Sequence, residues 1–188
     1  VKAMMPALLV LLMIQACCSK EQEDDINLLA IDNDTLQVKI DLERGGTISY
    51  ISESGSNRNL VNIYDEGRYI QQSYYAGKNM VRTAEGQHPD WSPWPWNPIQ
   101  AGDVYRNSAE ILEYTREGNT IYVKCIPMQW DMNNKPAEAI MEQWTTLKGN
   151  VLEVHNKFSC HRSDTIYGEG VVSDQELPAV YPVSALSR

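Results

Sequence analysis

"AIMEQWTTLKGNVLEVHNKFSC", residues 139–160, carries a clear signal of the fold class. Two runs rich in β-forming residues are separated by a short Lys-Gly-Asn turn at 148–150. In the second run, the apolar side chains of Leu152, Val154 and Phe158 alternate with polar ones. Because successive side chains of a strand point to opposite faces, this period of two is typical of a strand with one buried face. The stretch therefore predicts an antiparallel hairpin.

The same period of two recurs along most of the chain. It is clearest at 36–42, where four apolar residues alternate with polar ones, and a second hairpin with a Gly-Asn turn is predicted over 109–126. Further runs of β-forming residues predict strands at 47–52, 60–64 and 68–77. No helix-length amphipathic pattern follows the first 16 residues. The sequence therefore predicts an all-β protein, an antiparallel sandwich of large sheets over residues 36–188.

Charge narrows the classes of ligand. The 188 residues carry a formal net charge of −9, and the sequence has no basic run. Nucleic-acid binding needs lysine and arginine clustered on one face, so we expect no nucleic-acid partner. An acidic surface favours neutral or cationic ligands.

The first residues predict export and a lipid anchor. Residues 1–16 combine an early lysine, an apolar run too short to span a bilayer and Ala16 immediately before Cys17. The motif "IQAC" at 14–17 resembles the lipoprotein signal of Gram-negative bacteria, in which the cysteine receives lipid; an ordinary cleaved signal is the alternative. The acidic stretch 17–35 then reads as a tether holding the domain off the outer membrane, on its periplasmic or its surface-exposed side.

Two cysteines lie within strand-like runs. Cys125 and Cys160 have two readings: a disulfide, which an oxidising compartment permits, or two buried small apolar residues.

The first candidate site is "DWSPWPWNPIQAGD", residues 90–103. Its three prolines fix the backbone in an extended form, so ordering the tryptophans costs less entropy. Flat indole faces suit the C–H faces of sugar rings, and nearby amides and a carboxylate could bind sugar hydroxyls. The candidate ligand-binding residues are Trp91, Trp94, Trp96, Asn97, Gln100 and Asp103. The alternative is that one or more of the tryptophans close the end of the sandwich as core.

The second candidate is "YDEGRYIQQSYYAG", residues 64–77. In a strand, Arg68, Gln72 and Tyr74 would share one side. Arg68 could then bind hydroxyls or a uronate carboxylate. The alternative is a structural ion pair between Arg68 and Asp65 or Glu66.

Several segments together resemble a known family. They are "GGTISYI", "NLVNIYDEGRYIQQSYYAG", "WPWNPIQAGD", "MEQWTTLKGNVLEVHNKF" and "QELPAVYP", which spread over residues 36–182. They are similar to secreted bacterial proteins with a galactose-mutarotase-like fold, a β-supersandwich shared by aldose epimerases and by domains of glycoside hydrolases and polysaccharide lyases. Because such domains are longer than this chain, the resemblance implies that the C-terminal part of the domain is missing.

The resemblance also suggests a catalytic residue. Aldose epimerases use a glutamate base with a histidine acid, so Glu176 is the candidate base. The histidines His88, His155 and His161 do not match the epimerase pattern. The sequence therefore leaves open a hydrolase, lyase or epimerase, a non-catalytic glycan-binding lipoprotein, and a structural envelope lipoprotein.

One motif bears on cofactors. "DMNN" at 131–134 places oxygen ligands at alternate positions and could contribute to a calcium site, but it lacks the glycine and the final glutamate of a calcium-binding hand. An asparagine-rich turn is the alternative. We expect no other cofactor.

Overall fold

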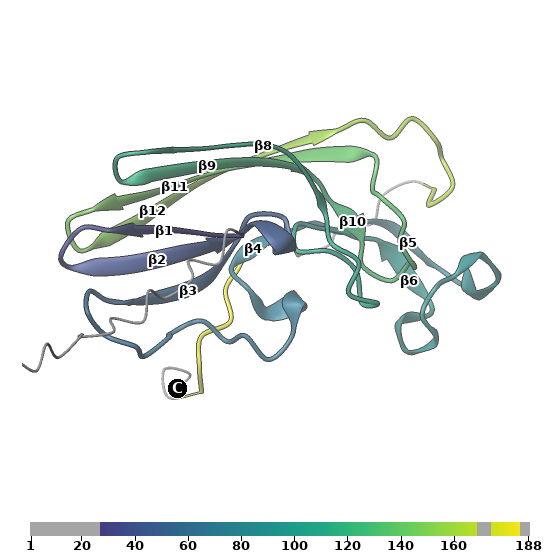
Figure 1. Ribbon diagram of the computed structural model, residues 1–188. Coiled ribbons are helices and arrows are strands. Elements are labelled where there is room, and N and C mark those ends of the chain that lie inside the picture. The colour runs from purple at the N-terminus through teal and green to yellow at the C-terminus, as the bar shows by residue number, and fades with distance from the viewer. Residues whose placement is uncertain (1–26, 169–173, 185–188) are drawn as a thin grey trace, which may run out of the picture.

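The computed structural model describes residues 27–168 and 174–184. Over these residues the regular structure consists of strands and short 3₁₀ turns. The strands form four antiparallel sheets. The protein is therefore all-β, as predicted (Figure 1).

The largest sheet has the strand order β12-β11-β9-β8 and contains both predicted hairpins. Its strands are β8 (Glu110–Glu117), β9 (Thr120–Ile126), β11 (Ala139–Lys148) and β12 (Val151–Cys160). In β11, buried and half-buried residues alternate without a break from Ala139 to Leu147, which confirms the period of two read from the sequence. Trp144 lies opposite Tyr122 on one side and His155 on the other.

A three-stranded sheet packs against the large one and completes a sandwich (Figure 1). Its strands are β1 (Leu28–Asp32), β2 (Leu36–Asp41) and β3 (Thr47–Glu53). The core between the two layers consists of Ile31, Val38, Ile40, Ile48, Val61, Ile70, Ile121, Val123 and Leu147. Strand β1 lies inside the stretch 17–35 that was expected to be tether, and Ile31 is 1% exposed, so the folded domain begins earlier than predicted.

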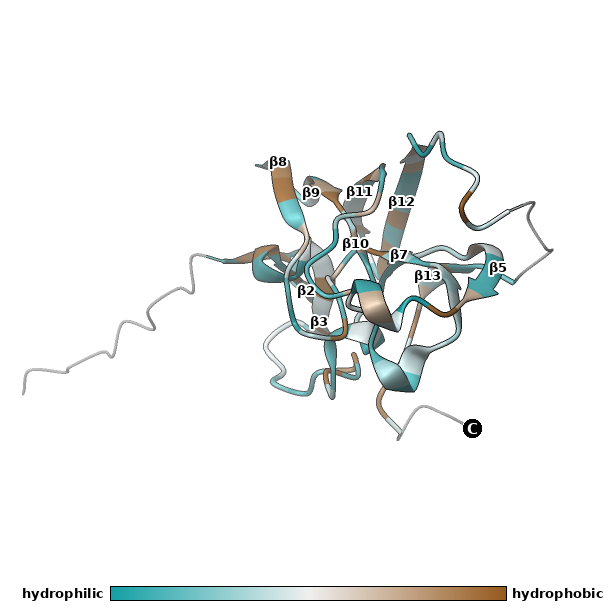
Figure 2. Ribbon diagram, turned by 90° about the vertical axis from the view of Figure 1, so that its right-hand side faces the viewer, coloured by the Kyte–Doolittle hydropathy of each residue, from teal (hydrophilic) through white to brown (hydrophobic). Residues whose placement is uncertain are grey.

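Shorter strands form the other end of the molecule, which faces the viewer in Figure 2. One sheet has the order β10-β7-β4-β13, and β5 pairs with β6. These strands are β4 (Gln71–Ser73), β5 (Ala76–Met80), β6 (Trp94–Trp96), β7 (Pro98–Ile99), β10 (Met128–Gln129) and β13 (Glu176–Ala179). Four 3₁₀ turns complete the described structure: η1 (Leu42–Arg44), η2 (Glu66–Arg68), η3 (Thr83–Glu85) and η4 (Pro89–Trp91).

Two strand predictions need correction, and strands occur in one stretch where the sequence indicates none. Residues 60–64 form no strand, because only Val61 makes an isolated bridge, to Pro182. The predicted strand 68–77 is broken: it begins in the turn η2, continues as the three residues of β4, and restarts as β5. The connection 78–103, which carries no strand pattern in the sequence, contains the short strands β6 and β7.

Cys125 and Cys160 are both free, so the disulfide reading is wrong. Cys125 is buried, as the second reading expected, whereas Cys160 is exposed. In the register of the large sheet Cys125 lies opposite Met141, while Cys160 lies opposite Ala139 at the end of its strand.

Two consecutive glycines make the turn into β3. Gly45 and Gly46 have φ values of 64° and 75°, in the left-handed region that favours glycine. A side chain on Gly45 would overlap the backbone carbonyl of Gln100, and one on Gly46 would overlap Val123. The turn therefore packs against the Gln100 backbone at Gly45 and against Val123 of β9 at Gly46, where an added side chain would not fit.

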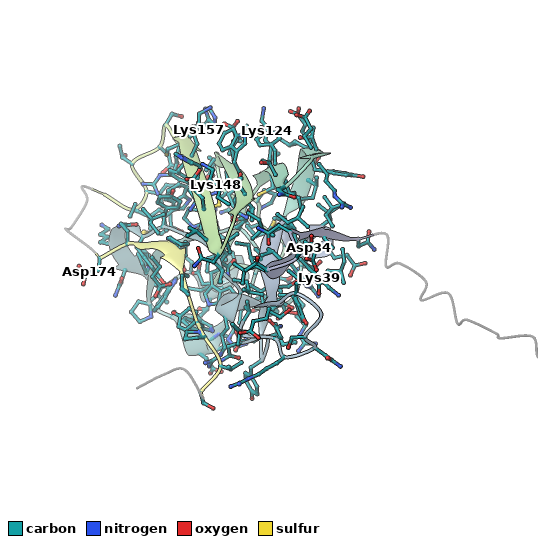
Figure 3. All side chains as sticks on the ribbon, turned by 90° about the vertical axis from the view of Figure 1, so that its left-hand side faces the viewer. Asp34, Lys39, Lys124, Lys148, Lys157 and Asp174 are labelled. Carbon is teal, nitrogen blue, oxygen red and sulfur yellow. The ribbon has the colours of Figure 1, made fainter. Side chains whose placement is uncertain are left out.

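The outer face of the large sheet carries charged and aromatic pairs. Lys124 and Lys157 project from this face (Figure 3). Lys157 Nζ lies 2.6 Å from Glu142 Oε2, and the Tyr122 hydroxyl donates to Glu142 Oε1 at 3.0 Å. Tyr122 and Trp144 pack with ring centroids 4.9 Å apart. These are cross-strand pairs on a half-exposed face.

Candidate functional site

A cleft of about 200 Å³ opens at the end of the molecule built from short strands. Several elements bring their side chains there: η2, the β4–β5 connection, η4 with β6 and β7, the end of β10, and β13. The lining residues are Asp65, Gly67, Arg68, Tyr75, Trp91, Trp94, Asn97, Ile99, Trp130, Glu176 and Tyr181. Of the ten residues predicted to bind or act on a ligand, Arg68, Trp91, Trp94, Asn97 and Glu176 meet here.

Aromatic rings form the walls of this cleft. The Trp91 ring stands nearly perpendicular to Trp94, with centroids 4.7 Å apart, and nearly perpendicular to Trp130 at 5.5 Å. Tyr75 meets Trp94 edge to face at 6.2 Å. Edge-to-face contact is the arrangement that ring quadrupoles favour. The rings therefore support one another and line the cleft at steep angles instead of stacking into a closed block.

Asn97 holds the Trp94 ring. The Trp94 indole Nε1 donates to Asn97 Oδ1 at 3.2 Å. The amide of Asn97 in turn donates to the backbone oxygen of Tyr74 at 2.7 Å, and Asn97 is 1% exposed. A buried, engaged amide thus fixes the edge of a ring that lines the cleft.

Two tyrosine hydroxyls flank Glu176. Tyr181 donates to Glu176 Oε1 at 3.0 Å, and Tyr75 to Oε2 at 3.5 Å. Burial raises the pKa of both tyrosines above the usual value, and the nearby Glu176 carboxylate raises it further. Both hydroxyls therefore keep their protons at neutral pH and act as donors to the carboxylate.

The position of Glu176 depends on pairing between distant segments. Strand β13 pairs with β4, which places Glu176 opposite Ser73. The neighbouring Gln175 amide makes two hydrogen bonds to the backbone of Tyr75: it accepts from the nitrogen at 2.8 Å and donates to the oxygen at 2.9 Å. These contacts fix Glu176 and Tyr75 relative to each other.

Arg68 enters the cleft as half of an ion pair. Its Nε donates to Asp65 Oδ2 at 2.9 Å, which is the pairing given above as the alternative to ligand binding. The Asp65 hydrogen bond and charge raise the pKa of Arg68 above its already high value. The cleft thus contains two carboxylates, Asp65 and Glu176, against one guanidinium.

Trp96 lies outside the cleft. It is 3% exposed and packs with Ala137, Ala139 and Tyr167. Its Nε1 donates to Glu138 Oε2 at 3.3 Å. The core alternative therefore describes Trp96 fully. Trp91 and Trp94 line the cleft and, being partly buried, also pack against Ile99, Ala101 and Trp130.

Four other predicted residues also lie away from the cleft and connect structural elements. Gln72 donates to the backbone oxygen of Glu142, and Tyr74 stacks on Phe158 at 3.9 Å. The Gln100 amide donates to the backbone oxygens of the two glycines before β3, at 3.1 and 3.2 Å. The Asp103 carboxylate accepts from the backbone nitrogens of Tyr105, Asn107 and Asn134.

Sequence reasoning missed Asp65 as a cleft residue, together with Tyr75, Trp130 and Tyr181. Tyr75 lies on the other side of the expected strand alternation from Tyr74, so a regular strand would have turned it away. Trp130 and Tyr181 stand apart from the tryptophan–proline run, and no local pattern linked them to it. Contacts between segments far apart in the sequence place Trp130 and Tyr181 at the cleft.

The histidines do not line the cleft. His88 accepts from the backbone nitrogen of Asp90 at 3.2 Å and lies 5.2 Å from the Tyr105 ring. In the "DMNN" stretch, Asp131 accepts from Gln87, and Asn133 Oδ1 accepts from Asn107. No group of three or more histidine, cysteine or acidic side chains suited to a metal ion occurs within 27–168 and 174–184.

The predicted signal and Cys17 lie outside the residues that the structure describes. Among those it does describe, no helix has the length and apolar character needed to cross a membrane.

Comparison of the chain with models of known protein families, with curated proteins and with solved structures finds no match.

Proposed function

We propose that this chain is a carbohydrate-binding domain of the galactose-mutarotase-like supersandwich type, anchored to a bacterial outer membrane through lipid on Cys17. The aromatic cleft is its binding site, and its ligand is an extracytoplasmic glycan. The observation that carries the proposal is the meeting of Trp91, Trp94 and Trp130 around one small cleft that also holds a carboxylate.

The chemistry of the cleft suits a sugar ring. Indole faces present flat apolar surfaces to the C–H groups of a ring, while Glu176 and the Arg68–Asp65 pair offer acceptors and donors to its hydroxyls. Pockets for drug-sized ligands measure about 300–1,000 Å³, so this smaller cleft of about 200 Å³ suits one sugar residue. The rest of a glycan chain would run over the surrounding surface.

A second candidate function is sugar chemistry at the same place, by a hydrolase, lyase or epimerase. The observation that favours it is the pair of tyrosine hydroxyls on Glu176, which joins a carboxylate to two protonated groups inside a binding cleft. Under this candidate, Glu176 acts as general base.

Calorimetric titration with a panel of soluble glycans tests the proposal. We expect at least one glycan to bind, Trp94→Ala to weaken that binding, and Trp144→Ala to leave it unchanged because Trp144 lies on the outer face of the large sheet. If no glycan binds, or if the two variants behave alike, the proposal is wrong and a structural role in the envelope is favoured.

Catalysis is tested with the same ligands. A glycan that binds is incubated with the wild type and with Glu176→Gln, which keeps the shape of the side chain but removes the carboxylate. Product formation by the wild type alone supports the catalytic role. Binding without product in either protein assigns a purely binding function, and product formation in both excludes Glu176 as the base.

A further inference from the structure

We infer that the sugar residue held in the cleft carries a positive charge, as a free amino sugar does. The inference rests on the proposed function and specifies the substrate class of the same site. Three features of the cleft carry it: the balance of charge, the tryptophan rings that line it with no cationic side chain of the described residues over them, and the remaining acceptor capacity of Glu176.

The balance of charge disfavours an anionic ligand. Arg68, the cation expected to receive a uronate, is bound to Asp65 at 2.9 Å. With that pair neutral overall, the carboxylate of Glu176 has no cation in contact among the described residues that line the cleft. A uronate entering the cleft would meet a like charge, whereas an ammonium group would meet an opposite one.

The tryptophan faces suit a cation. A positive charge within about 6 Å of an aromatic centroid is attracted by the ring, and tryptophan binds most strongly. Elsewhere in the chain this interaction is satisfied internally, because the Arg162 guanidinium lies 4.8 Å from the centroid of Trp96. In the described part of the chain, no lysine or arginine takes the corresponding place over Trp91, Trp94 or Trp130.

Glu176 can accept further hydrogen bonds. A carboxylate has about four acceptor sites, two on each oxygen. Tyr181 donates to one oxygen and Tyr75, more weakly at 3.5 Å, to the other. An ammonium group has three donors and no acceptor, so it complements the sites that remain. The tyrosine hydroxyls hold the carboxylate in place without neutralising it.

The test uses one sugar backbone in two charge states. Calorimetry compares an oligosaccharide of free glucosamine with its fully N-acetylated counterpart and with an oligogalacturonate, at a mildly acidic pH that keeps the sugar amines protonated. We expect the free-amine form to bind roughly tenfold more tightly than the acetylated one, the scale of a partly desolvated cation–aromatic contact. The oligogalacturonate should bind least, and added salt should reduce the preference for the amine.

Two variants locate the effect. Glu176→Gln should weaken binding of the amine form by a larger factor than binding of the acetylated form, so that the preference narrows to the part that the tryptophan faces contribute. Glu142→Gln is the matched control, because this carboxylate already holds Lys157 on the outer sheet face, and it should keep the preference.

The outcomes distinguish failure of the cationic ligand from failure of the proposed glycan-binding function. Equal binding of the free-amine and acetylated forms, or tighter binding of the uronate, overturns the cationic ligand while leaving a Trp94-dependent glycan site intact. If none of the three oligosaccharides nor any glycan of the wider panel binds, the cationic ligand and the proposed function both fail.

Discussion

Trp94 and Asn97 are joined by a hydrogen bond of 3.2 Å between the indole Nε1 and the amide oxygen. This contact separates Trp94 from Trp96, two residues along the same short strand. Trp94 is anchored by its edge and remains part of the cleft wall, whereas Trp96 is 3% exposed in the core. Two identical side chains in one motif therefore have different roles.

Substituting the two tryptophans should give opposite results. Trp94→Ala should weaken glycan binding by roughly 1–3 kcal/mol, taking the scale of aromatic stacking on flat nucleobases, with a small loss of stability. Trp96→Ala should lower the free energy of unfolding by about 3–5 kcal/mol, because it empties a packed core position. Urea unfolding and calorimetric binding of both variants check this. Unfolding of Trp94→Ala would make that residue core and contradict its place in the wall.

The turn at Gly45 should tolerate no side chain. Gly45→Ala combines a left-handed backbone with overlap against the Gln100 carbonyl. We therefore expect it to lower the free energy of unfolding by about 3 kcal/mol or more. Gly118→Ala is the control, because Gly118 has a φ of 54° but no neighbouring atom within 4 Å of the added carbon. Gly118→Ala should lower the free energy of unfolding by only about 1–2 kcal/mol. Equal losses in urea unfolding would contradict the close approach of the Gln100 backbone to Gly45.

Cys125 should make stability fall at alkaline pH. Burial raises the pKa of its thiol to about 12, so the folded state holds this proton at a pH where the unfolded chain, with a thiol pKa of about 8.5, releases it. The stability that the protonated Cys125 thiol contributes is fully present below its pKa in the unfolded chain. It is lost as pH rises toward the pKa of the thiol in the folded protein. Urea unfolding of Cys125→Ala across this window should show a smaller decline than the wild type. Cys160→Ala, at an exposed position, should decline as the wild type does.

The lipid anchor is testable independently of the fold. In a host with the lipoprotein pathway, the wild-type chain should incorporate labelled fatty acid and Cys17→Ser should not. Incorporation in neither protein, or equally in both, contradicts anchoring at Cys17.

The sandwich could be predicted because its signals are local. In the hairpin 139–160, alternation and turn residues specify the strands and their buried face, and the observed register pairs Ala139 with Cys160 through to Lys148 with Val151. Strand β1 was missed because its five residues follow an acidic run that dominates the composition of the segment. Its place depends on pairing with β2, which supplies the partner that its own sequence does not indicate.

The cleft could be predicted only in part. The tryptophan–proline run marked Trp91 and Trp94 because composition alone sets them apart. Bringing Glu176 and Tyr181 to them requires pairing of β13 with β4 and a bridge from Val61 to Pro182, and no local pattern encodes such non-local contacts. Arg68 shows the opposite case, since its partner Asp65 lies three residues away and the ion pair was one of the two stated alternatives.

The most direct test of the glycan cleft follows the indole N–H signals of all five tryptophans by ¹⁵N–¹H NMR during titration with a bound glycan. We predict that the signals of Trp91, Trp94 and Trp130 shift with one common affinity, while those of Trp96 and Trp144 stay in place. Saturable shifts at Trp144 with none at Trp94, or no shifts at any tryptophan with every glycan of the panel, would contradict a binding site in this cleft.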